Sequence, residues 1–254
     1  MIEAILYFIA FAALQILPSS LLLWVWPHTG ITALDSTELL MAATALSSVL
    51  TLVLFTALKW ARPARHYLLS RPYAVVLWAI IAACGTAIPS TWLQELMPEL
   101  PDLVEQQMSD ILMHRGGYFI ICILAPLTEE LAFRGAILRS LLAWRPQHQW
   151  GMIALSALMF ALMHANPAQM PHAMLMGLLM GWMYARTQSI VPSLAFHWAN
   201  NTIAYLLFRA YPDPSLRLAD YFGGDTRAVG AALIFSLFIM LPSIFQLHQR
   251  MRKA

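Results

Sequence analysis

Long apolar segments separated by short polar stretches run through the whole chain of 254 residues. An α-helix needs about 20 mostly apolar residues to cross the hydrocarbon core of a bilayer. We therefore expect an all-α fold, a polytopic transmembrane helix bundle of about eight spans. The apolar segments that meet this requirement are residues 2–26, 38–58, 73–92, 117–144, 150–166, 171–186, 190–209 and 228–247.

The composition indicates the same class of protein. Hydrophobic residues make up 60% of the chain and charged residues only 11%, whereas a soluble domain carries about 25% charged residues. So few charges cannot cover the surface of a water-soluble globule of this size, and we expect a single membrane domain over 1–254. The net charge of +2 gives no indication of nucleic-acid binding. Cys84 and Cys122 both lie in apolar runs, which indicates neither a disulfide framework nor a cysteine-based metal site.

Lysine and arginine are distributed unequally between the two sets of connecting segments. Cytoplasmic loops of membrane proteins carry an excess of these residues. With the N-terminus in the cytoplasm, the segments and span ends on that side hold the larger share: Lys59, Arg62, Arg65, Arg71, Arg139, Arg145, Arg186, Arg250, Arg252 and Lys253. This bias predicts a multi-pass protein with both termini in the cytoplasm, and we expect the membrane to be a bacterial cytoplasmic membrane. The exterior segment 93–116, after Pro101, forms either an amphipathic helix on the outer surface or a solvated loop.

The fourth predicted span contains three ionisable residues, Glu129, Glu130 and Arg134. A charged group at the bilayer centre costs at least about 2.5–3.5 kcal/mol. Glu130 and Arg134 are four positions apart and share a helix face, so they can neutralise each other. Glu129 lies about 100° around the helix from Glu130 and has no partner in its own span. A purely structural ion-pair cluster explains Glu130 and Arg134 but not Glu129, which is therefore a candidate general base.

Two further spans carry polar side chains. His164 ends the fifth span, and His197 and Asn201 lie four positions apart in the seventh. His197 and Asn201 share one helix face, so both can hydrogen-bond to one point, while Asn200 points elsewhere. Each of these residues alone fits packing or interhelical hydrogen bonding. Together with an unpaired carboxylate, they favour activation of water with stabilisation of an oxyanion.

The depth of these residues in the membrane is a test of whether they meet. With a rise of about 1.5 Å per residue, Glu129 and His164 fall at a similar depth. His197 comes out about two helical turns nearer the cytoplasm, and Asn201 lies between. A shared site therefore requires different span ends or a helix that is not straight and regular.

Three short motifs resemble those of a known family. Glu129-Glu130-x-x-x-Arg134, Phe160-x-x-x-His164 and His197-x-x-x-Asn201 occur in this order, each within a predicted span. In this they resemble the CPBP intramembrane proteases, the CAAX prenyl protease 2 and bacteriocin-processing group that is also called the ABI family. The resemblance covers residues from about 117 to 209, whereas the first three spans and the last match only as hydrophobic segments.

The resemblance implies an intramembrane endopeptidase with its catalytic core at about 117–209. Its substrate would be a membrane-associated or lipid-linked peptide, which is prenylated in one branch of the family. By similarity, Glu129 activates the attacking water with help from His164, while His197 and Asn201 stabilise the oxyanion. The residues that would support the site are Glu130, Arg134 and Phe160.

The family has been described both as metalloendopeptidases and as glutamate-type proteases. Glu129, His164 and His197 are sufficient for a three-ligand zinc site with an open position. Glu129 cannot easily be both a metal ligand and a free base, so we expect a metal-free mechanism that requires no cofactor.

The sequence is also compatible with two functions of other classes. A metal or small-molecule transporter could use the methionines around His172, because thioether ligands suit Cu(I). These methionines are Met170, Met174, Met176, Met180 and Met183. Methionine is also a flexible packing residue, and the five do not fall on one helix face. The other alternative is a non-catalytic scaffold with the same fold.

Overall fold

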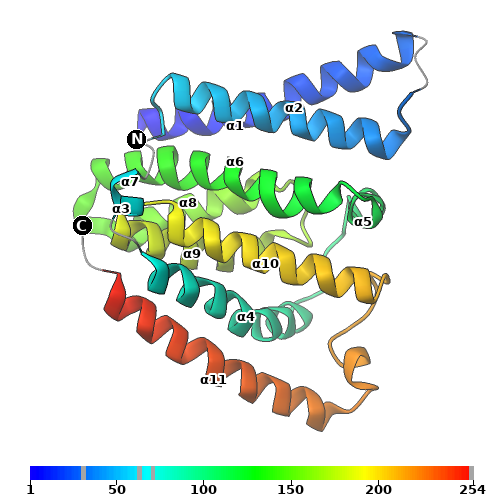
Figure 1. Ribbon diagram of the computed structural model, residues 1–254, viewed down its shortest axis with the longest axis vertical. Coiled ribbons are helices and arrows are strands. Elements are labelled where there is room, and N and C mark those ends of the chain that lie inside the picture. Colours follow the sequence, from blue (N-terminus) through cyan, green and yellow to red (C-terminus); the bar gives the residue numbers. More distant parts are fainter. Residues whose placement is uncertain (30–32, 62–64, 70–71, 252–254) are drawn as a thin grey trace.

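The computed structural model describes residues 1–29, 33–61, 65–69 and 72–251. Within these residues the fold is entirely helical, which confirms the predicted all-α class. Long helices run back and forth between two ends of the molecule (Figure 1). Those with regular α-helical winding are α1 (Ile2–Val25), α2 (Ser36–Ala57), α4 (Tyr73–Glu95), α8 (Gln149–Met163), α9 (Met170–Thr187), α10 (Val191–Ala210) and α11 (Thr226–Arg250). The short elements are α3 (Arg65–Leu69), α5 (Glu105–Met113) and the 3₁₀ turns Trp26–Thr29, Pro146–His148 and Asp220–Phe222.

One further long helix, residues 117–144, contains two π-helical turns. It contains a π-helical turn at Phe119–Leu124, then α6 (Ala125–Ala132), a second π-helical turn at Phe133–Leu138, and finally α7 (Arg139–Trp144). A π-helical turn closes its hydrogen bonds over five residues instead of four, so it shifts the residues that follow. The straight-helix assumption behind the depth comparison was therefore wrong for this helix.

Every predicted apolar segment coincides with a helix, but the predicted number of spans is not confirmed. Among the described helices, four are long and apolar enough to cross a membrane: α1 with the turn that follows it, α2, α4 and α11. The central helices fall short because α8 has only 15 residues and because the others carry the polar residues of the candidate site.

The outer helices present apolar side chains to their surroundings. On α1 and α11, Leu21, Trp24, Phe235 and Phe238 are all more than 60% exposed. Exposure of such large apolar side chains is what contact with lipid requires, and a soluble protein rarely shows it over a large area. The long apolar helices and their exposed side chains fit an integral membrane protein.

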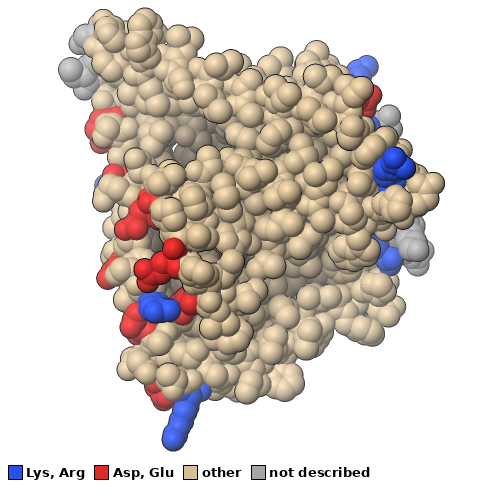
Figure 2. Space-filling model, turned by 180° about the vertical axis from the view of Figure 1, so that it is seen from behind, with Lys and Arg blue, Asp and Glu red and all other residues tan. Residues whose placement is uncertain are grey.

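Charged side chains gather at the two ends, with an uncharged band between them (Figure 2). We call one end the acidic end; its carboxylates are Asp35, Glu38, Glu95, Glu99, Asp102, Glu105, Asp110, Asp213, Asp220 and Asp225, and its arginines are Arg115, Arg209, Arg217 and Arg227. The opposite, basic end carries Lys59, Arg139, Arg145, Arg186 and Arg250. The helix α5 lies at the acidic end with Ile111 buried, which confirms the helical alternative for segment 93–116.

Close helix contacts hold the central helices together. The pair Gly177 and Gly181, a G-x-x-x-G pattern typical of tight packing, lies where α9 packs against α8. A Cβ atom on Gly177 would lie 2.9 Å from Cβ of Ala157, and one on Gly181 would lie 2.8 Å from Cγ2 of Ile153. The two glycines thus allow α8 and α9 to pack closely, and this brings the backbone of α9 near the candidate site.

Candidate active site

A buried ion pair forms the base of the site. Nη1 of Arg134 lies 2.8 Å from Oε1 of Glu130, and both side chains are at most 2% exposed. Nη2 of Arg134 donates to the carbonyl of Gly177 at 3.3 Å, and its guanidinium lies 4.6 Å from the ring centre of Phe160. This confirms the predicted pair, which also connects the helix 117–144 with α8 and α9. Such additional contacts offset part of the cost of removing two charges from water.

His197 connects the two adjacent glutamates. Its Nδ1 lies 3.0 Å from Oε1 of Glu130, and its Nε2 lies 3.7 Å from Oε2 of Glu129. An ionised carboxylate only accepts hydrogen bonds, so the bond to Glu130 places a proton on Nδ1. Nε2 is thereby directed at Glu129. The expectation that Glu129 has no partner in its own helix holds, but α10 supplies one.

The ring of His164 is oriented by its own helix. Its Nδ1 lies 3.0 Å from the carbonyl oxygen of Phe160, and a carbonyl can only accept. Nδ1 therefore carries the proton, and in the neutral ring Nε2 keeps its lone pair and acts as an acceptor. The Phe160 ring packs edge-on against His164 and His197, with centroid distances of 4.9 and 5.9 Å. Phe160 thus contacts both histidines as well as Arg134.

Asn201 is held by the helix 117–144. Its Nδ2 donates to the carbonyl of Ile121 at 3.0 Å, and Ile121 lies within the first π-helical turn. A π-helical turn is often found at a functional site, where it changes the backbone bonding of the helix. The second N–H of the Asn201 amide is left for another acceptor.

Two residues that sequence reasoning did not assign to the site also belong to it. Nδ2 of Asn200 lies 3.4 Å from Nε2 of His172 and 3.4 Å from Oδ1 of Asn201. The prediction that Asn200 points away from the site was therefore wrong, because residues about 100° apart on α10 both border the same cavity. In the sequence, His172 was distinguished only by being a histidine within a largely apolar segment.

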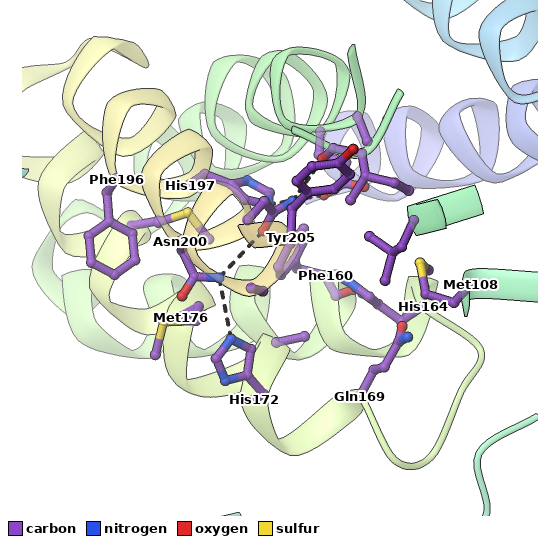
Figure 3. Close-up of a pocket in the computed structure, with 18 of the residues that line it drawn as sticks. Met108, Phe160, His164, Gln169, His172, Met176, Phe196, His197, Asn200 and Tyr205 are labelled. Carbon is purple, nitrogen blue, oxygen red and sulfur yellow. Dashed lines mark hydrogen bonds and ion pairs between the residues drawn. The ribbon is translucent and has the colours of Figure 1, made fainter. Parts of the chain in front are cut away.

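These side chains surround a cavity of about 350 Å³, which we call the central pocket. Figure 3 shows His164, His172, His197 and Asn200 around it, together with apolar side chains of α5, α9 and α10. Its lining comprises Gln94, Met108, Leu112, Ile121, Ala125, Glu129, Phe160, His164, Gln169, His172, Ala173, Met176, Met180, Phe196, His197, Asn200, Asn201, Ala204 and Tyr205. An apolar pocket with a few convergent polar groups is the usual form of a substrate site.

Only some of these methionines border the central pocket. Met176 and Met180 line the central pocket, whereas Met183 is completely buried in the core, and Met170 and Met174 pack against that core. This arrangement is what apolar packing produces and gives the copper-transport alternative no support.

The zinc alternative was considered for Glu129, His164 and His197. Among the residues that the structure describes, no three His, Cys, Asp or Glu side chains are grouped so that they could hold a metal ion. As they lie, these residues do not fit a three-ligand zinc site.

A group of hydrogen bonds fixes the turn that follows His164. Asn166 is completely buried; its Oδ1 accepts from the backbone N–H of Leu103 and its Nδ2 donates to Oδ1 of Asp102, both at 2.9 Å. The backbone N–H of Ala168 donates to the carbonyl of Pro101 at 3.3 Å. We call these contacts the loop clasp; they hold the segment before α5 against the connection between α8 and α9. These contacts could not be predicted from the sequence.

Comparison with known proteins gives one match. Residues 114–203 match the family model of the Rce1-like type II CAAX prenyl endopeptidases. No curated protein and no solved structure matches the chain. All three motifs, and therefore Glu129, His164, His197 and Asn201, lie within the matched residues. The match confirms the resemblance to the CAAX proteases, and it extends over residues 114–203.

Proposed function

We propose that this protein is an intramembrane endopeptidase that cleaves a membrane-associated or lipid-linked peptide, with Glu129 as the base that activates water. The observation that carries this proposal is the position of Glu129 beside His197, at 3.7 Å, on the wall of the central pocket. The Glu129 side chain is 25% exposed, so water can reach it. The match to a protease family supports the same reaction class.

In the proposed reaction, the Glu129 carboxylate takes a proton from a water molecule as the water oxygen attacks the peptide carbonyl carbon. The neutral His164 ring offers the lone pair of Nε2 and helps to position this water. The resulting tetrahedral intermediate carries its negative charge on the former carbonyl oxygen. When the C–N bond breaks, the proton on Glu129 passes to the leaving amine, which restores the carboxylate.

The oxyanion would be stabilised by hydrogen bonds from His197 and Asn201. The bond to Glu130 keeps a proton on Nδ1 of His197, so His197 can donate from Nε2 only when it carries both protons. In that form its positive charge lies between Glu129 and Glu130, which balance it. Asn201 contributes the amide N–H that is not bonded to Ile121. Removal of one such oxyanion donor typically lowers kcat by about 10²–10³-fold.

The proposed reaction uses no metal ion. The carboxylate supplies the base, and nitrogen-bound protons supply the oxyanion contacts. Glu129, His164 and His197 do not form a metal-ligand group among the described residues, which supports this choice.

The test is a comparison of membrane peptides from cells that carry the wild-type protein or the Glu129→Gln variant. We expect a new peptide terminus that appears with the wild type and is absent with Glu129→Gln. Glu105→Gln is the matched control, because Glu105 is an exposed carboxylate of α5 that does not line the central pocket. Cleavage that persists in a folded and inserted Glu129→Gln variant would contradict the proposal.

A further inference from the structure

We propose that the central pocket receives its peptide from the acidic end of the molecule, and that this end faces the exterior of the cell. The substrate would then be an extracytoplasmic segment of a membrane-associated protein. This inference rests on the proposed endopeptidase function, and it concerns the side of the membrane on which that function takes place.

Toward the basic end, tightly packed apolar side chains lie beyond the site. After Glu129 and Glu130 the helix 117–144 continues toward the basic end with Ile137, Leu138 and Leu141, all of which are at most 1% exposed. Met183 of α9 is likewise completely buried and belongs to the same core. Packing of this kind leaves no space for water or for an extended peptide.

Toward the acidic end, the central pocket is bounded by the ends of helices and by α5. Gln94 lies in the last turn of α4, Gln169 precedes α9, and Met108 and Leu112 belong to α5. Figure 3 shows Met108, Gln169 and His164 on one side of the pocket. The central pocket therefore extends from Glu129 and His197 toward the acidic end.

A second cavity lies next to the pocket, at the acidic surface. It has a volume of about 600 Å³ and shares Gln94 with the central pocket. We call it the vestibule; it is lined by Thr91, Gln94, Glu95, Met97, Pro98, Glu99, Leu100, Ala168, Pro171, Pro214, Ser215, Leu216 and Arg217. Nε2 of Gln94 donates to the carbonyl of Ala168 at 2.8 Å, so Gln94 and the turn after His164 separate the two cavities. A peptide with its scissile bond at Glu129 would extend into the vestibule by displacing the Gln94 side chain from this bond.

The charges at the two ends assign the sides of the membrane. Cytoplasmic segments of membrane proteins are enriched in lysine and arginine, and this enrichment sets orientation. In the sequence, ten lysines and arginines fall in the segments and span ends on the side of the basic end, against the four arginines of the acidic end, so the basic end belongs in the cytoplasm. The vestibule then opens to the exterior, and a prenylated C-terminus in the cytoplasm would meet the closed side of the molecule.

Labelling with a membrane-impermeant maleimide tests the orientation without any need for activity. Cys84 is replaced by serine, the buried Cys122 is kept, and single cysteines are introduced as Ser36→Cys, Ser215→Cys or Gln147→Cys. All three positions are exposed; Ser36 and Ser215 lie at the acidic end and Gln147 at the basic end. In intact spheroplasts we expect labelling at 36 and 215, and labelling at 147 only after permeabilisation. Labelling at 147 in intact spheroplasts, with 36 and 215 protected, would overturn the proposal.

The same variants test the vestibule as the route of entry. Ser215 lines the vestibule, whereas Ser36, an exposed serine at the same end, does not. A bulky maleimide on Ser215→Cys should lower cleavage by about tenfold or more because the peptide is displaced, and the same reagent on Ser36→Cys should leave cleavage unchanged. Equal cleavage after both modifications would overturn entry through the vestibule. If instead Glu129→Gln leaves peptide termini unchanged while the labelling pattern is as expected, the proposed function fails and the orientation stands.

Discussion

Glu129 and Glu130 are adjacent and chemically identical, yet their surroundings assign them different tasks. Glu130 is completely buried and binds Arg134 and His197, so it fixes the positions of other side chains. Glu129 borders the central pocket and faces the remaining nitrogen of His197. The same substitution at these two positions should therefore have different consequences.

Glu130→Gln should destabilise the protein, whereas Glu129→Gln should leave its stability nearly unchanged. Without the Glu130 charge, the Arg134 guanidinium is buried and uncompensated, which costs about 3–5 kcal/mol. The measurement is thermal unfolding of the two detergent-purified variants side by side, followed by size-exclusion chromatography. An equal loss of stability in both variants would contradict the division of tasks.

Chelation gives a prediction for the reaction itself. If Glu129 acts as a free base, cleavage by the purified protein should persist after treatment with EDTA or 1,10-phenanthroline. Metal analysis of the active protein should show less than one zinc per chain. Loss of activity that zinc restores would instead assign Glu129, His164 and His197 as ligands.

At the scale of elements, the helices and the contacts within a helix could be predicted from the sequence. Contacts between segments that are distant in the chain could not. The apolar segments predicted the helices, and the four-residue spacing predicted the pair of Glu130 and Arg134, because helix periodicity determines both. The contact between His197 and Glu130 joins positions 67 residues apart. The π-helical turn that bonds Asn201 leaves no simple trace in the apolar pattern. For the same reason the sequence suggested four residues of the site but missed His172, Asn200 and the loop clasp.

The contact between α8 and α9 should be sensitive to a single added side chain. Gly177→Leu places a Cβ atom 2.9 Å from Ala157, and overpacking of this kind costs about 1–3 kcal/mol. It also pushes the Gly177 carbonyl away from Arg134, so activity should fall as well as stability. Gly151→Leu is the matched control, because a Cβ there meets nothing within 4 Å. Equal thermal stability and cleavage in the two variants would show that the close approach is unimportant.

For the whole molecule, the loop clasp joins the acidic end to the site. Asn166→Ala removes two hydrogen bonds from a buried amide, and the groups left unpaired cost about 1–3 kcal/mol. We expect the turn after His164 to loosen, so that cleavage slows and the segment 93–116 becomes easier to digest by protease.

The control for this variant is Gln106→Ala. Gln106 is exposed on α5 and bonds only Asp110 in the same helix. The Gln106→Ala variant should cleave the substrate normally and should keep the protease resistance of the wild type. If Asn166→Ala behaves like Gln106→Ala, the clasp does not position the site.

The packed side chains beyond the site have a consequence for the cell's energy supply. A hydrolase within a membrane must admit water to its carboxylate, and a continuous chain of water molecules from one face to the other would conduct protons. Ile137, Leu138 and Leu141 interrupt such a chain between Glu130 and the basic end. If Glu129 acts as proposed, the protein can therefore admit water to this carboxylate from one side while the transmembrane proton gradient stays intact.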